Sequence, residues 1–226
     1  FTNAPLSSCY PAVTAVTESG RLIERHFDKT VMRRRLGVKL CAILHEPERI
    51  AAKALELVGN GGCLCVMLNT VAQAQQVYRE LKKQNTSQVL LLFHARFPAG
   101  RRDEIETQCL RLFGKDKSHR PKKAIVVTTQ IGELSLDLDW DVMMTAIAPV
   151  DLLLQRAGRE QRHLDTLGPA HFKEPILYVL VPKDKRAVSL EQKYGEDGAV
   201  YPPCLLAQSE YLLADRQEIR IPEDMA

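Results

Sequence analysis

Short apolar runs, each followed by a segment with helical spacing, recur along the middle of the chain. The runs are apolar at nearly every position, which is typical of strands buried on both faces of a parallel sheet. The expected strands are 40–44, 63–68, 88–93, 124–128, 142–147 and 176–181, and the expected helices are 46–57, 70–83, 98–113 and 152–162. Because strands and helices alternate with short joins, the predicted fold class is α/β, a three-layer sandwich around a mainly parallel sheet.

The pattern is less regular toward both ends of the chain. Residues 1–38 contain one expected edge strand at 10–16, and residues 183–226 combine Gly and Pro with one expected helix at 205–214. We therefore expect a connecting segment (1–38), an α/β domain (39–182) and a C-terminal extension (183–226). Because the chain begins at Phe1 and not at Met, we also expect it to be part of a longer protein.

Composition narrows the class of protein. The 226 residues are 45% hydrophobic and 26% charged, which predicts a folded core, and the net charge of +3 means that any basic surface is local. The six cysteines are scattered, and Cys63 and Cys65 alternate within one apolar run, so we expect reduced core residues and no metal site. No signal peptide or spanning apolar run is present in the sequence, so a cytoplasmic location without a membrane partner is expected.

Polar residues follow three successive expected strands. In open α/β sheets ligands bind beyond the carboxyl ends of strands, and helix starts offer free N–H groups to phosphates. Each residue also has an ordinary explanation, as a helix cap or a loop residue. Their recurrence nevertheless favours a shared phosphate-binding or ligand-binding site at this edge. The residues are Asn69, Thr70, His94, Arg96, Thr128 and Thr129.

The segment 152–162, LLLQRAGREQR, is rich in arginine. On a continuous helix Gln155, Arg159 and Arg162 would share one side, because offsets of three and four residues bring side chains together. A guanidinium is permanently charged and its planar fork matches phosphate oxygens, so the pair could clamp a transferring phosphoryl group. The alternative is an amphipathic surface helix with arginines in solvent, in which Arg156 pairs with Glu160 four residues on.

Two motifs within 128–162 carry a family resemblance. QRAGREQR (155–162) resembles motif VI of superfamily 2 helicases, and TTQIGELSLDLD (128–139) resembles their motif V. The run SLDLDWD, a strand and then APVDLLLQRAGR resembles, more narrowly, the CRISPR-associated helicase-nuclease of type I systems. Glu160-Gln161 stands where that family often has Leu-His, and Ile131-Gly132 where it often has two valines, so the subtype stays open.

The resemblance implies the second RecA-like motor domain of a helicase, with ATP and Mg held mainly by a first motor domain absent from this chain. It implies Arg162 as arginine finger, with Arg159 supporting it. Gln155 would hold the arginine helix in register with the nucleotide, Asp137 would touch the ribose or relay closure, and Gly158 would lie at the nucleotide. The strand-end residues would hold single-stranded DNA. Further implied partners are the first RecA-like domain and the nuclease domain of the parent protein, and a CRISPR RNA-guided surveillance complex.

Sequence features missing from the chain limit what it can do alone. It has no G-x-x-x-x-G-K-[ST] loop for ATP phosphates and no adjacent His-Asp pair, so the isolated chain is expected to be inactive. Asp103-Glu104 resembles a magnesium-binding helicase motif, but it does not follow an apolar strand and should lie on an exposed helical face. The basic stretch 115–123 is expected to be a mobile solvated loop, with nucleic-acid contact as the alternative.

Three other functions remain open from the sequence. An RNA helicase would share the motor motifs, because only contacts to the 2′-hydroxyl separate the two substrates. A non-catalytic nucleic-acid-binding RecA-like domain would keep the fold without turnover. An ordinary α/β domain without phosphate chemistry would be favoured if the strand-end residues faced away from a common cleft.

Overall fold

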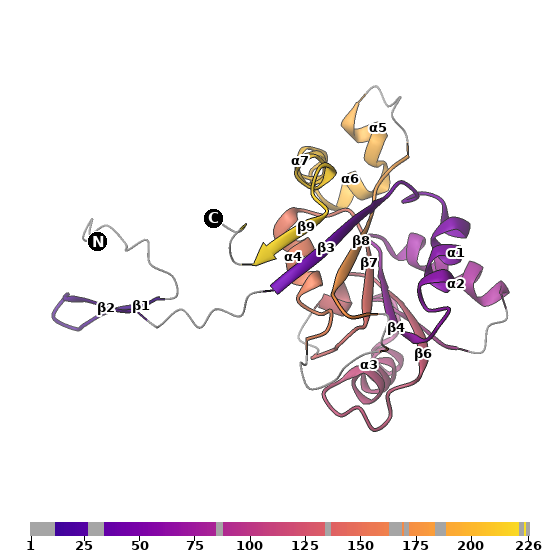
Figure 1. Ribbon diagram of the computed structural model, residues 1–226, viewed down its shortest axis with the longest axis horizontal. Helices are drawn as coiled ribbons and strands as arrows, with labels where there is room; N and C mark the ends of the chain where they lie inside the picture. The colour runs from indigo at the N-terminus through magenta and orange to yellow at the C-terminus, as the bar shows by residue number, and fades with distance from the viewer. Residues whose placement is uncertain are drawn as a thin grey trace. The chain divides into compact units, whose positions relative to one another are not determined.

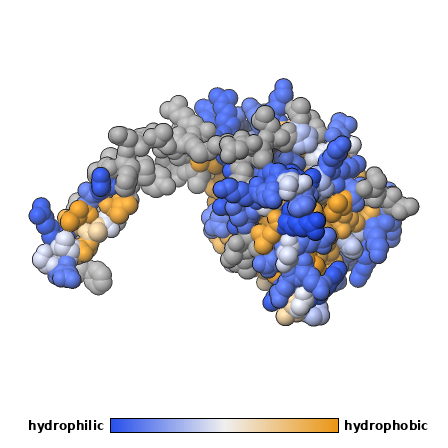
Figure 2. Space-filling view, turned by 90° about the horizontal axis from the view of Figure 1, so that it is seen from below, coloured by the Kyte–Doolittle hydropathy of each residue, from blue (hydrophilic) through white to orange (hydrophobic). Residues whose placement is uncertain are grey.

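The computed structural model of the chain describes residues 12–26, 34–84, 88–133, 137–162, 169, 172–183, 189–221 and 224. It divides into two compact units, Phe1–Arg34 with Arg220–Ala226, and Arg35–Ile219. The first unit contains an antiparallel hairpin of β1 (Ala12–Val16) and β2 (Leu22–His26). Apolar side chains lie on the surface of this hairpin (Figure 2); Val13 and Val16 are 58% and 67% exposed.

A seven-stranded sheet has the order β5-β6-β4-β7-β8-β3-β9. Every neighbouring pair from β5 to β3 is parallel. Thr128 is paired with both Met67 and Phe93, so β4, β6 and β5 end at the same level of the sheet. The strands are β3 (Arg34–Cys41), β4 (Gly62–Met67), β5 (Val89–Phe93), β6 (Lys123–Thr128), β7 (Val142–Ala146), β8 (Ile176–Leu180) and β9 (Glu218–Ile221).

Helices cover both faces of the sheet (Figure 1). The connections through α1 and α2 run toward β5 and those through α3 and α4 run the opposite way, so right-handed crossovers place the two pairs on opposite faces. This arrangement confirms the predicted α/β class with a mainly parallel sheet between helical layers. The helices are α1 (Pro47–Leu57), α2 (Val71–Lys83), α3 (Ala99–Phe113) and α4 (Val150–Ala157).

The local sequence explains the elements nearest the core. All six residues of β4 are buried, as its apolar run predicts for the central strand of a covered sheet, and Cys63 and Cys65 are buried free cysteines within it. The helix α2 begins with a capping box, in which Thr70 accepts from the Gln73 N–H and Gln73 accepts from the Thr70 N–H. These features confirm the strand and helix expected over 63–83.

Two parts of the fold differ from expectation. The strand expected at 40–44 is β3, which begins at Arg34 and ends at Cys41. Ile43 and Leu44 continue the apolar run because they stay buried in the turn that follows, so the run reports burial and not strand geometry. The C-terminal segment is also more structured than expected, with α5 (Leu190–Tyr194), α6 (Glu196–Val200) and α7 (Pro203–Ala214).

Candidate functional site

The arginine segment lies at the amino edge of the sheet. Trp140 precedes β7; its N–H donates to the Arg159 carbonyl at 3.0 Å, and its carbonyl accepts from the Gln161 N–H at 2.7 Å. This position follows from the topology, because α4 begins after the carboxyl end of β7 and runs back along it. The arginines therefore lie at the edge opposite to the strand ends that carry the other candidate residues.

The helix expected over 152–162 is wrong beyond Ala157, where α4 ends. Gly158 follows as its C-cap, and Gln161 has a φ of 44°, in the left-handed region. Trp140 supplies backbone partners that a continuing helix would have supplied. Arg159 and Arg162 lie beyond the helix, so helical spacing does not bring them onto one face with Gln155. Gln155 itself is on α4 and is exposed.

Arg156 is buried, with 0% of its surface exposed, so the alternative of a surface helix with its arginines in solvent is wrong for this residue. One terminal nitrogen donates to Thr145 Oγ1 at 2.6 Å and to the Ala146 carbonyl at 3.1 Å, and the other donates to Tyr201 Oη at 3.2 Å. Glu160 is equally buried and accepts from the Met143 N–H at 2.6 Å. The pattern of charges could not separate these buried groups from surface ones.

Arg162 and Asp137, which the sequence separates by a strand and a helix, are brought together. Arg162 Nε lies 2.9 Å from Asp137 Oδ1, and the two side chains are 42% and 50% exposed. Arg159 is half-buried and Gly158 is exposed in the same segment. Solvent screens an ion pair this exposed, so it holds Arg162 only weakly.

The basic stretch 115–123 is attached to the same edge through Lys117 and Arg120, which the expectation of a solvated loop did not include. Of its other basic side chains, Lys123 is of intermediate exposure and the rest are exposed as expected, namely Lys115, His119 and Lys122. Lys117 Nζ lies 2.6 Å from Asp139 Oδ2, and an Arg120 terminal nitrogen lies 3.0 Å from Asp141 Oδ1. The two basic side chains are only 16% and 15% exposed. By contrast, Asp103 and Glu104 are exposed on α3, as expected.

The strand-end residues lie at the opposite, carboxyl edge, on three neighbouring strands. Thr128, Thr129 and His94 are buried, whereas Arg96 is exposed. His94 stacks on Phe97 with ring centroids 4.2 Å apart, and burial lowers its pKa, which favours the neutral ring. Within the described structure its Nδ1 is buried without a hydrogen-bond partner. Arg96 is therefore the strand-end cation most accessible to a ligand.

The C-terminal extension already contacts Asn69 and Thr70. Asn69 Nδ2 donates to the Ile147 carbonyl at 2.8 Å and to Asp197 Oδ1 at 2.7 Å. The Thr70 hydroxyl caps α2 and lies 3.4 Å from Glu196 Oε2. The carboxylates of α6 thus stand beside both residues at the end of β4.

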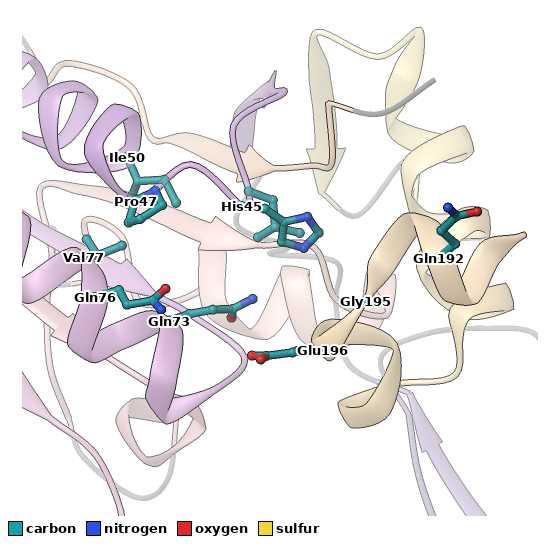
Figure 3. Close-up of a pocket in the computed structure, with 10 residues that line it drawn as sticks. His45, Pro47, Ile50, Gln73, Gln76, Val77, Gln192, Gly195 and Glu196 are labelled. Carbon is teal, nitrogen blue, oxygen red and sulfur yellow. The ribbon is translucent and has the colours of Figure 1, made fainter. Parts of the chain in front are cut away.

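A pocket of about 300 Å³ opens beside this contact, between α1 and α2 on one side and α5 and α6 on the other (Figure 3). Asp197 is fully buried and accepts from Gln73 Nε2 at 2.8 Å, with His45 Nε2 at 3.2 Å. The hydrogen bond to Asp197 raises the pKa of His45. Sequence reasoning missed His45 and Asp197, because an acid in a Gly-containing segment carries no local signal of burial.

The described residues contain neither a cluster of metal ligands nor a membrane-spanning helix. No three His, Cys, Asp or Glu side chains among them are grouped as metal ligands. No helix in the described ranges is long and apolar enough to cross a membrane.

The mainly parallel sheet with helices on both faces defines the class of the domain, a three-layer α/β fold. Residues 60–165 match the family model described as CRISPR-associated nuclease/helicase Cas3, C-terminal. The chain is 35% identical over 173 residues to the Cas3 nuclease/helicase of Streptococcus thermophilus, which is 76% of this chain and 18% of that protein. Residues 60–165 are therefore similar to the C-terminal part of the Cas3 nuclease/helicase family.

Solved structures agree with this assignment. The crystal structure of T. fusca Cas3-AMPPNP matches 98% of this chain with a TM-score of 0.84 and 36% identity, over 26% of its own length. A chain of a pre-nicking CRISPR RNA-guided surveillance complex matches 96% with a TM-score of 0.78 and 33% identity, over 28% of its length. The chain thus spans about a quarter or less of the proteins it resembles.

Proposed function

We propose that this chain is the second motor domain of an ATP-dependent helicase that translocates on single-stranded DNA in CRISPR interference. A first RecA-like domain of the parent protein would hold ATP and Mg, and a nuclease domain would lie elsewhere in it. The observation that carries the proposal is the partly exposed Arg162 beside Asp137 and Arg159 at the amino edge of the sheet. The similarity to T. fusca Cas3-AMPPNP, a structure named for an ATP analogue, supports nucleotide use.

The amino edge fits a nucleotide phosphate chemically. ATP with Mg would supply the phosphoryl group and its developing negative charge, and a positioned guanidinium neutralises such charge. Arg162 is permanently charged, and its partner Asp137 is itself half-exposed, so exchanging this carboxylate for a phosphate costs little. Arg159 would assist Arg162, and Gln155 and Gly158 would face the nucleotide. Asp137 would contact the ribose, or would pair with Arg162 again once the phosphate has left.

The carboxyl edge is the proposed nucleic-acid interface. Arg96 is exposed there beside the buried Thr128, Thr129 and His94, whose backbone and side chains would line the track of the strand. The side chains of Asn69 and Thr70 contact the carboxylates of α6, so they would have to leave these carboxylates before they could contact the nucleic acid. Binding through phosphates is tolerant of sequence. The similarity to a chain of a surveillance complex supports that partner, and translocation assays on DNA and RNA strands separate the two substrates.

The test is the Arg162→Ala variant of the parent protein. Steady-state ATPase, stimulated by single-stranded DNA, should fall by roughly 10³-fold in kcat, the scale of a charge-neutralising arginine, while strand binding stays nearly intact. Arg162→Lys should restore little, because an ammonium lacks the planar fork. Arg111→Ala, at an exposed position of α3, is the matched control and should leave kcat unchanged.

The competing readings give different results in the same assay. A surface arginine without a catalytic role leaves kcat within a few fold when Arg162 is replaced. A non-catalytic binding domain gives a parent protein that binds single strands and hydrolyses no ATP. Either result would refute the proposed function.

A further inference from the structure

Asp139, the last residue of the segment that resembles motif V, connects three segments at the amino edge. It is 3% exposed. Its Oδ1 accepts from the Arg162 backbone N–H at 2.8 Å, and its Oδ2 lies 2.6 Å from Lys117 Nζ. Its own N–H donates to the Phe113 carbonyl at 2.9 Å, and its carbonyl accepts from Arg120 at 2.8 Å. The carboxylate therefore contacts the backbone of Arg162 and not its guanidinium.

The backbone that Asp139 holds is strained. Gln161 precedes Arg162 with a φ of 44°, the left-handed region that residues with a Cβ rarely adopt. Its N–H donates to the Trp140 carbonyl at 2.7 Å, and its Nε2 donates to the Phe172 carbonyl at 2.9 Å. Such a conformation persists only where surrounding contacts determine it, and strained residues cluster at functional sites. The Asp139 bond fixes the residue immediately after the strained one.

We infer that Asp139 is a positioning residue for Arg162, and that Lys117 keeps its carboxylate in place. The inference rests on the proposed function. Asp139 holds the Cα of Arg162 at the sheet edge, while the guanidinium is left to move between Asp137 and a phosphate. An arginine on a loosely held loop would lose this alignment, and misplacement of a catalytic group by about 1 Å can cost about 100-fold in rate.

The carboxylate is suited to this double contact because each oxygen has a different partner. In Asp139→Asn one oxygen still accepts from the Arg162 N–H, but the amide NH₂ then faces the Lys117 ammonium, donor against donor. Lys117→Met removes the cation and leaves both oxygens of Asp139. Lys115 is exposed in the same loop, two residues before Lys117, so Lys115→Met is the matched control.

The experiment measures backbone protection and turnover in the parent protein. Without nucleotide, amide hydrogen exchange over residues 159–162 should be about tenfold faster in Asp139→Asn and also faster in Lys117→Met, because opening of this segment becomes easier. ATPase kcat should fall about tenfold or more in Asp139→Asn, with affinity for single-stranded DNA within about twofold of the parent. Lys115→Met should change neither quantity. Asp139→Asn combined with Arg162→Ala should be no slower than Arg162→Ala alone, since both act through one guanidinium.

The outcomes separate this inference from the proposed function. If Arg162→Ala lowers kcat but Asp139→Asn changes neither exchange nor kcat, the inference is overturned and the proposed function stands. If Asp139→Asn and Arg162→Ala lower kcat additively, Asp139 acts by another route and the inference is also overturned. If Arg162→Ala leaves kcat unchanged, both fall. Should Asp139→Asn fail to fold, Lys117→Met decides, and unchanged exchange and kcat would overturn the inference.

Discussion

Replacing Arg156 should destabilise the domain strongly, which a surface arginine would not do. Its guanidinium is fully buried and donates to Thr145, Ala146 and Tyr201. Hydrogen bonds from a charged donor contribute about 1.5–3 kcal/mol each, and an unpartnered buried polar group costs about 1–3 kcal/mol. Losing three such bonds and leaving their buried acceptors without a donor should together cost about 3–5 kcal/mol in Arg156→Ala.

The size of this loss makes it measurable. A domain is stable by about 5–15 kcal/mol, so Arg156→Ala should remove a large fraction of the free energy of unfolding. Urea unfolding of the 226-residue chain, followed by circular dichroism, measures the change as a shift in the midpoint at constant slope. Arg111→Ala is the matched control, because its exposed position on α3 predicts a change within about 0.5 kcal/mol.

Two intermediate variants test the physical reason. Arg156→Lys keeps a charge and can keep part of the hydrogen bonding, so it should lose less than Arg156→Ala. Tyr201→Phe removes only the acceptor at 3.2 Å and should cost about 1 kcal/mol. A change below about 1 kcal/mol for Arg156→Ala, equal to that of Arg111→Ala, would refute the burial argument.

Three further predictions concern the chain and its ligands. The isolated chain should show no ATPase above background, because its sequence lacks a phosphate-binding loop, and robust hydrolysis would contradict the division of roles between two motor domains. Arg96→Ala should lower affinity by a similar factor for unrelated single strands and reduce the salt dependence by about one phosphate contact, whereas a changed sequence preference would argue against backbone contact. The hydrogen bond to Asp197 raises the pKa of His45 in the folded protein. The pair should therefore contribute its full free energy of unfolding below about pH 6.5, the pKa of an unfolded His, and lose this contribution as the pH rises through the raised pKa. In urea unfolding, His45→Asn should flatten that decline, and an unchanged profile would remove His45 as its cause.

The sequence predicted the sheet because burial on both faces leaves a direct signal. The strand β4 is apolar throughout and β6 is apolar from Ala124 to Val127, and the structure buries every residue of β4 and all but the first of β6. The cap at Thr70 was equally local, because a capping box needs only four consecutive residues. Features that depend on one segment alone were therefore predictable.

The placement of the arginines was not predictable, because it depends on partners distant in the chain. Gly158 within 152–162 marks the end of the helix, but nothing in this segment signals the ladder between Trp140 and 159–161. The buried Asp197 contacts Asn69 from 128 residues away. Lys117 pairs with Asp139 across a strand, a contact that the composition of the loop did not indicate. The sequence shows where the charged side chains are, but tertiary contacts determine which of them are buried.

The two groups of candidate residues lie at opposite edges of one sheet, and this separation constrains the proposed motor. With five residues in β7 and a rise of about 3.3 Å each, the edges are about 17 Å apart, so no side chain can contact both a nucleotide and the strand-end residues. Coupling between them must pass through the packed domain, which resists deformation because its interior is close-packed. Arg156 belongs to the segment that leads into the amino-edge arginines, yet its guanidinium contacts Thr145 and Ala146 at the carboxyl end of β7. Loss of stability and loss of coupling are therefore expected together at Arg156, whereas Arg162→Ala should lower turnover without lowering stability.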